Sequence, residues 1–187
     1  MNQETATQPS SENLNPVDWQ AANSARASTG APVQFISFAI DDDQYGVDIM
    51  AVREIKGWSE ITHLPNQPDY VRGVLNLRGV IVPIIDLRCR FGQGLTEAGP
   101  THIVIIVQIG TRLAGLLADR VLDIVSLEQA QLQAVPKIAQ ASRINFLSGL
   151  ATIEGAMIAL IDLKNLLTFS TEEIAEQDRS AARNTTH

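Results

Sequence analysis

The sequence has little of the material from which several classes of site are built. Its 187 residues include one cysteine, Cys89, and acidic residues outnumber basic ones, which gives a formal net charge of −7. A single cysteine excludes a disulfide framework and fits a reducing cytoplasm. The acidic balance argues against nucleic-acid binding, because phosphate contacts need clustered Lys and Arg. We therefore expect a cytoplasmic protein with no nucleic-acid partner.

Long apolar runs are also missing. The longest runs, such as residues 80–85, have the length of a β-strand and fall far short of the roughly 20 apolar residues that span a bilayer. Residues 1–30 have no basic start followed by an apolar stretch, so they do not resemble a secretory signal. We expect no direct insertion into a membrane.

The residues of common catalytic and metal sites are scarce. The histidines His63, His102 and His187 form no cluster with zinc-ligand spacing, and the sequence has no phosphate-binding loop or dinucleotide fingerprint. Cys89 lies in no local signature of a nucleophile. The run 41–43, three aspartates, lacks the ligand spacing of a calcium loop and is interpreted as a hairpin turn. We expect no catalytic residue, no metal and no cofactor.

A duplication organises the rest of the chain. The stretch 73–87, GVLNLRGVIVPIIDL, aligns without gaps with 149–163, GLATIEGAMIALIDL, at an offset of 76 residues (149 − 73). Each copy is typical of two short apolar strands joined at a tight turn, where Gly79 or Gly155 tolerates positive φ.

A second block of the sequence repeats as well. Residues 35–55 align with 104–124 at an offset of 69 (115 − 46), which matches Gly46 with Gly115.

Asp86 and Asp162 lie at equivalent positions near the end of the 73–87 and 149–163 copies, and they suit the N-cap of a short helical turn. Because the duplication places them in separate units, they are not expected to act as the carboxylate pair of a hydrolase.

The repeats predict an all-β fold of two SH3-like, five-stranded β-barrels packed together. The Gly-rich link 92–100 is taken as the boundary between one subdomain, about 32–94, and another, about 100–169. Residues 1–31 are too polar to order themselves and are predicted to be a disordered tail. In 170–187, a capping box predicts a short C-terminal helix followed by a frayed end.

Arg78 is the most informative single residue. One reading is that it braces its own barrel by pairing with Glu54. In the second copy, however, the equivalent positions hold Asp123 and Glu154, two like charges that cannot form an ion pair. The repeated sequence pattern around them is nevertheless kept. Because an exposed ion pair contributes only about 0 to 1 kcal/mol, recognition of a partner is the favoured reading of this arginine.

Several runs of the chain are specific enough to suggest a family. QYGVDIMAVREI, LPNQPDYVRGVLNLRGVIVPIIDLRCRFG, GLLADRVLDIVSL and a final GL…IEG…LIDL follow one another between Gln34 and Phe169. This region resembles the CheW family, the coupling proteins of bacterial chemotaxis signalling. The resemblance implies a cytoplasmic adaptor without catalysis, held at the inner face of the membrane through receptor arrays. Its implied partners are the cytoplasmic tips of chemoreceptors and the regulatory domain of the histidine kinase CheA.

The resemblance also implies partner-binding residues, carried over by motif. Those of the first barrel are Val52, Glu54, Gly73 and Arg78. Those of the second barrel, implied to line a receptor-binding groove, are Ile103, Gly115, Val121 and Ile124. On this reading Gly73→Asp is expected to weaken kinase binding while leaving the protein folded.

Three alternatives remain at this point. Small β-barrels also bind single-stranded nucleic acid, although exposed aromatics among basic residues are lacking. An enzyme would need a pocket with convergent polar groups. Within the family, a scaffold for a different chemosensory pathway is equally compatible with these residues.

Overall fold

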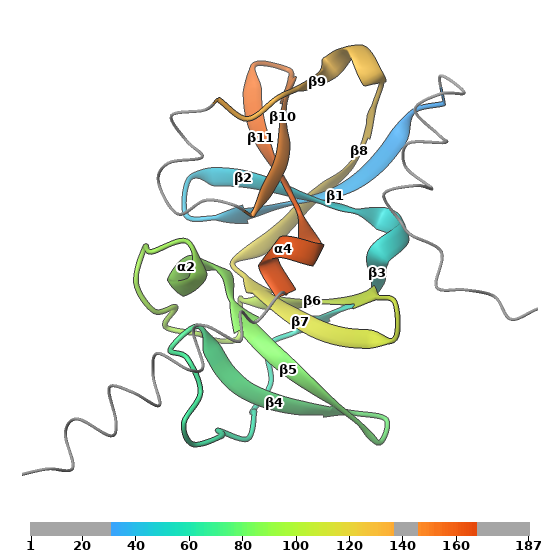
Figure 1. Ribbon diagram of the computed structural model, residues 1–187. Coiled ribbons are helices and arrows are strands. Elements are labelled where there is room, and N and C mark those ends of the chain that lie inside the picture. Colours follow the sequence, from blue (N-terminus) through green and yellow to red (C-terminus); the bar gives the residue numbers. More distant parts are fainter. Residues whose placement is uncertain (1–30, 137–145, 168–187) are drawn as a thin grey trace, which may run out of the picture.

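The structure, a computed structural model, describes residues 31–136 and 146–167, and almost all of its regular elements are strands (Figure 1). The strands are β1 (Val33–Ile40), β2 (Asp43–Asp48), β3 (Val52–Gly57), β4 (Val71–Leu77), β5 (Val80–Asp86), β6 (Ile103–Ile109), β7 (Arg112–Ala118), β8 (Arg120–Leu127), β9 (Leu132–Gln133), β10 (Leu147–Ile153) and β11 (Ala156–Ile161). Short helical turns are η1 (Ile49–Ala51), α2 (Leu87–Arg90), η2 (Gln129–Gln131) and α4 (Leu163–Leu167).

The strands form two sheets, each built from both halves of the chain. One sheet has the order β8-β1-β2-β11-β10-β9, and the other has the order β3-β6-β7-β5-β4. Figure 1 shows the first sheet above the second, with α2 and α4 between them. The prediction of an all-β fold of two packed units is confirmed.

The two halves exchange strands in matching ways. Most neighbours pair antiparallel, but β11 pairs parallel with β2, and β5 pairs parallel with β7. In these ladders Leu160 faces Gly46, and Ile84 faces Gly115. The repeat offsets relate Ile84 to Leu160 and Gly46 to Gly115. The first two strands of each repeat therefore complete the sheet of the other repeat.

The two sheets do not follow the boundary predicted between the sequence repeats. The division into 32–94 and 100–169 separates the sequence repeats but not the sheets, because β1 and β2 join β8–β11 while β6 and β7 join β3–β5. Sequence similarity locates each repeat but carries no signal for which copy a strand pairs with. The link 92–100 connects two strands of one sheet, β5 and β6.

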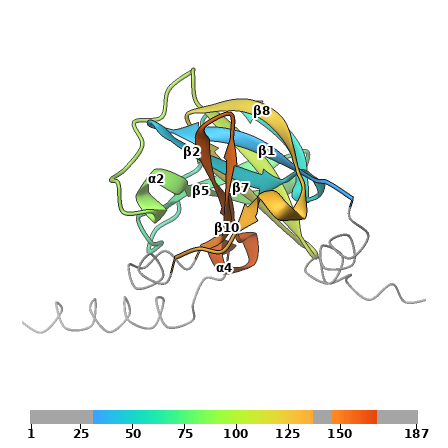
Figure 2. The same ribbon diagram turned by 90° about the horizontal axis from the view of Figure 1, so that it is seen from above.

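The buried side chains form three clusters. One fills the lower sheet and includes Val82, Ile84 and Ile106, and a second fills the upper sheet around Phe35 and Leu160. The third and largest lies between the sheets, and its fully buried members include Phe38, Val47, Ile85, Ile105 and Leu116. In Figure 2 β1 and β2 cross over β5 and β7, as this shared core requires. The barrels thus have filled interiors and a common core.

The predicted turns and caps are present. Arg78 and Gly79 have φ values of 51° and 91°, and Glu154 and Gly155 have 50° and 83°, so both hairpins turn through the left-handed region in the same way. This geometry matches a two-residue hairpin with both central residues at positive φ.

The two aspartates cap helices as predicted. Asp86 accepts from the Cys89 backbone N–H, and Asp162 accepts from that of Asn165. Asp86 is fully buried and also accepts from the Thr96 backbone N–H at 2.8 Å and hydroxyl at 2.7 Å. It therefore anchors the link that follows α2, beyond its predicted role as a cap.

Other expectations concern the ends of the chain. The described part of the segment 126–146 contains the end of β8, η2 and β9. The tail 1–31, apart from residue 31, and the helix expected within 170–187 lie outside the described residues. No described helix has the length and apolarity needed to span a membrane.

Gly73 occupies a crowded bulge in β4. Its φ is 141°, and a Cβ atom there would overlap the Thr62 carbonyl oxygen. Thr62 and Val74 exchange backbone hydrogen bonds of 2.9 and 2.8 Å, which fix this approach. The idea that the missing side chain admits another backbone is confirmed. Because the invading backbone is the chain's own, Gly73→Asp is now expected to destabilise the fold itself, in contrast to the expectation from the sequence.

A glycine substitution measures how rigid this contact is. Gly73→Ala should lower the free energy of unfolding by about 2 kcal/mol or more, because it combines overlap with backbone strain. The control is Gly57→Ala, where a Cβ atom would meet nothing within 4 Å, so the change should stay within about 0.5 kcal/mol. Equal unfolding midpoints in urea for the two variants would contradict this picture.

Candidate functional site

Three of the first-barrel residues lie where the two ends of the lower sheet approach each other. Val52 and Glu54 lie half-buried on β3, an edge strand, and Arg78 lies at the tip of the β4–β5 hairpin. The Arg78 Nη2 donates to Glu54 Oε2 at 3.0 Å, so the pair weighed in the sequence does form. The Arg78 side chain is nevertheless 83% exposed. Such a pair adds at most about 1 kcal/mol and leaves most of the guanidinium accessible.

Apolar side chains surround this pair. Ile55, next to Glu54, is 40% exposed, and Val80 and Ile81, just after the hairpin turn, are 50% and 61% exposed. Accessible apolar side chains next to an arginine form the composition that is enriched at protein interfaces. The β3 edge and this hairpin tip are named the first surface.

The second barrel carries an equivalent surface with different charges. Asp123 and Ile124 on β8 occupy the places of Glu54 and Ile55, and Glu154 occupies that of Arg78. Ile124 is 54% exposed, and Asp123 Oδ1 accepts from the Ile124 backbone N–H. Where the first surface holds an ion pair, this second surface holds two carboxylates, with an unchanged turn geometry.

The remaining predicted residues fall into two groups. Val52, Ile103 and Val121 all pack, partly buried, against the core shared by the two barrels. Gly73 and Gly115, by contrast, are buried. A Cβ atom on Gly115 would lie 2.5 Å from Ile84 Cδ1, which is the close approach of β7 to β5. These two glycines hold strands together and offer no side chain to a partner.

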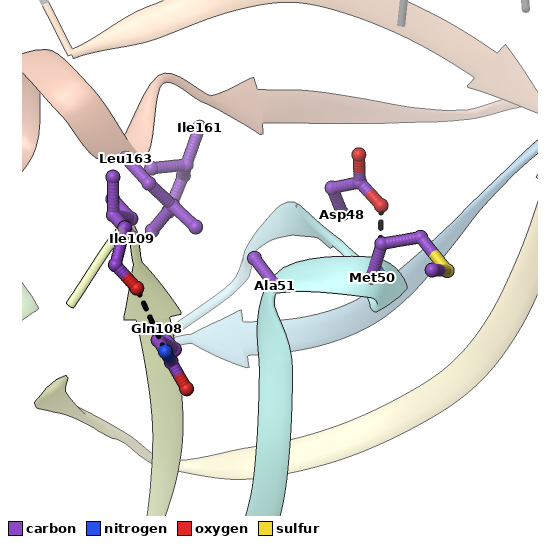
Figure 3. Close-up of a pocket in the computed structure, with 8 residues that line it drawn as sticks. Asp48, Met50, Ala51, Gln108, Ile109, Ile161 and Leu163 are labelled. Carbon is purple, nitrogen blue, oxygen red and sulfur yellow. Dashed lines mark hydrogen bonds between the residues drawn. The ribbon is translucent and has the colours of Figure 1, made fainter. Parts of the chain in front are cut away.

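Sequence reasoning missed a pocket between the barrels (Figure 3). Its volume is about 110 Å³, and it is lined by Asp48, Met50, Ala51, Gln108, Ile109, Gly110, Ile161 and Leu163. Its polar groups have partners, since Asp48 accepts from the Met50 backbone N–H and the Gln108 amide donates to the Gly110 carbonyl. The pocket is therefore apolar in character and lacks convergent groups for catalysis. Pairing of strands across the repeats creates it, so no local pattern could have shown it.

Two side chains of the described part have raised pKa values. Burial, followed by the charges of Asp86 and Asp69, raises the pKa of the Cys89 thiol, which makes its thiolate scarce at neutral pH. Burial and the charge of Asp43 raise the pKa of Tyr45 to about 12. Among the described residues no three His, Cys, Asp or Glu side chains are grouped as metal ligands would be.

Comparison with known proteins points to one family. The CheW-like domain matches residues 34–171. The chain is 39% identical over 153 residues to the chemotaxis protein CheW of Rhizobium meliloti, covering 82% of this chain and 99% of that protein. It is 39% identical over 148 residues to that of Klebsiella aerogenes, covering 79% and 88%. The crystal structure of scaffolding protein TtCheW from Thermoanaerobacter tengcongensis matches with a TM-score of 0.68 and 32% identity, covering 74% of this chain and 90% of that one.

Stability measurements can separate bracing from other roles of the ion pair. Arg78→Asn should keep the free energy of unfolding or raise it slightly, because the turn favours Asn at this φ and little is lost with the pair. Glu54→Gln should change it by less than about 1 kcal/mol. A loss above about 2 kcal/mol in both variants, measured in urea, would mean that the pair braces the barrel.

Proposed function

The chain belongs to the CheW family of chemotaxis coupling adaptors, and we propose that it joins the cytoplasmic tips of chemoreceptors to the regulatory domain of the histidine kinase CheA. On this proposal it works in the cytoplasm, at the inner face of the membrane, and carries out no chemistry. Its role is to hold two proteins at fixed positions relative to each other. The residues that matter are therefore surface residues whose identity the fold does not require.

The observation that carries the proposal is the comparison of Arg78 with Glu154. The two residues sit at φ values of 51° and 50° in equivalent hairpins, so the backbone accepts either charge. A non-glycine residue in this region is itself unfavourable by roughly 1 kcal/mol, and Asn or Gly would suit the turn better. An exposed arginine at such a position supports a role in recognition.

The proposal assigns the two partners to different surfaces. The kinase domain contacts the first surface through Val52, Glu54 and Arg78. The receptor tip, a helical element, lies in the groove implied for Ile103, Val121 and Ile124, with apolar anchors at helical spacing. Val52 and Val121, on the edge strands of the two sheets, both border the shared core, which supports a groove that uses both barrels. Gly73 and Gly115 act indirectly, by keeping their strands in place.

Charge reversal at Arg78 tests the kinase surface. Arg78→Glu should leave the fold intact, because Glu154 occupies the same turn, but should weaken binding to the CheA regulatory domain at least tenfold, about 1.4 kcal/mol. Arg112→Glu makes the same charge change at an exposed position on β7 and should leave affinity within about twofold, a difference of roughly 0.4 kcal/mol. Calorimetric titration of each variant supplies the affinities, with thermal melting as the folding check.

A double reversal then separates stability from recognition. Glu54→Arg combined with Arg78→Glu restores an opposite-charge pair, so it should regain any stability lost by the single change. Binding should remain weak, because the partner still meets the wrong charge. Full recovery of affinity in the double variant, or parental affinity in Arg78→Glu, would refute the proposed role of Arg78.

A further inference from the structure

Strand β3 carries a β-bulge at Arg53. In the ladder with β6, Val52 faces Val107 and Glu54 faces Ile106, so no residue of β6 lies opposite Arg53. Bulges of this kind are frequent at sheet edges, where the extra residue redirects a side chain. Arg53 is exposed on such an edge strand, and the bulge gives its side chain a direction of its own.

The second barrel keeps this bulge but changes the side chain. The repeat offset of 69 relates Arg53 to Leu122. In the ladder of β1 with β8, two successive residues of β1 face Asp123 and Val121, so Leu122 is the bulged residue. The fold therefore uses the bulge in both barrels and accepts a cation or an apolar side chain there. Nothing in the architecture requires an arginine at this position.

The guanidinium of Arg53 is held in place by Gln108 on β6. Arg53 Nε donates to Gln108 Oε1 at 2.7 Å, and Gln108 Nε2 donates to the Gly110 carbonyl at 2.7 Å. This amide orients the guanidinium without neutralising it. In the described part of the chain Arg53 forms no ion pair. A fixed guanidinium of this kind suits a carboxylate from a partner, which can accept two hydrogen bonds from it.

Gln108 and Gly110 also line the pocket between the barrels (Figure 3). The Asp48 carboxylate in this lining accepts from the backbone N–H of η1 at 2.8 Å. An apolar cavity of about 150 Å³ holds a benzene-sized group. A volume of about 110 Å³ therefore suits one branched aliphatic side chain. The apolar part of the lining comes from Met50, Ala51, Ile109, Ile161 and Leu163.

We propose that the pocket and Arg53 together form a subsite for the receptor tip. The pocket takes one aliphatic side chain of the tip helix, and Arg53 pairs with a carboxylate one helical turn away, because residues three or four apart share a helix face. Ala51 and Ile109, like Val121 of the proposed receptor groove, pack against the shared core. The apolar anchor supplies contact area, and Arg53 determines which receptor sequence is accepted. This inference rests on the proposed function and names a specificity residue within it.

Charge reversal at two arginines gives a crossed test. Arg53→Glu should weaken binding of a soluble receptor-tip fragment at least about tenfold and leave binding of the CheA regulatory domain within about twofold. Arg78→Glu should show the opposite pattern. Calorimetric titration measures both affinities, and thermal melting checks that each variant is folded. Parental affinity of Arg53→Glu for the receptor tip, or an equal loss for both partners, would overturn the inference.

A nearly isosteric change at Gln108 separates charge from packing. Gln108→Glu keeps an acceptor for Arg53 Nε but adds a carboxylate that neutralises the guanidinium. Affinity for the receptor tip should fall at least about fivefold, and what remains should depend less on salt concentration than parental binding does. Gln108→Leu adds no charge and should cost only about two- to threefold. Unchanged affinity and salt dependence in Gln108→Glu would contradict the pairing by Arg53.

Exchange of charges between the partners identifies the carboxylate. Each acidic residue of the receptor-tip fragment is changed to lysine in turn, and each fragment is titrated against the parent and against Arg53→Glu. One change should weaken binding to the parent and bring binding to Arg53→Glu within about threefold of the parental complex. If none of these changes compensates for Arg53→Glu, the inference is wrong.

Filling the pocket tests the apolar half of the subsite. Ala51→Leu adds an aliphatic group to the wall and should lower receptor-tip affinity at least about fivefold, with kinase binding kept. Should this variant melt as an unfolded protein, methyl resonances of Ile109 and Leu163 in the parent supply the test, since they should shift when the receptor-tip fragment binds. Unshifted methyls in the bound complex would overturn the subsite. A parent that does not bind the receptor tip would refute the proposed function itself, whereas parental affinity in Arg53→Glu refutes this inference alone.

Discussion

Each barrel depends on two strands supplied by the other half of the chain. The crossing points are the parallel ladders of β2 with β11 and of β5 with β7, where Gly46 and Gly115 leave room for Leu160 and Ile84. Neither sheet can close before both halves of the chain are present. The exchange also creates the shared core, whose buried residues come from both sheets, and this core sets how the two barrels face each other.

The exchange explains why the chain has two similar surfaces with different chemistry. Duplication places β3 and β8 at equivalent sheet edges, so the backbone is the same and only the side chains differ. The first surface pairs Glu54 with Arg78, and the second carries Asp123 and Glu154. A symmetric frame thus carries two chemically different surfaces.

Much of this structure follows from local sequence. The hairpin turns at Arg78 and Glu154 and the caps at Asp86 and Asp162 depend on neighbouring residues, and all of them were predicted correctly. The exchange of strands across the predicted subdomain boundary was not foreseen, because strand pairing between repeats depends on packing that no local pattern records. Gly73 was placed at a close backbone approach, yet its neighbour, Thr62, belongs to the same chain. The pocket was missed because residues from three separate segments line it.

Separate expression of the two repeats tests the exchanged arrangement most directly. Residues 31–94 contain β1–β5, and residues 95–170 contain β6–β11. Because each sheet needs strands from both pieces, neither piece alone should show cooperative unfolding by circular dichroism. Their mixture should form a one-to-one complex with the melting behaviour of a folded protein. Cooperative folding of either piece alone would contradict the exchange of strands and, with it, the shared core.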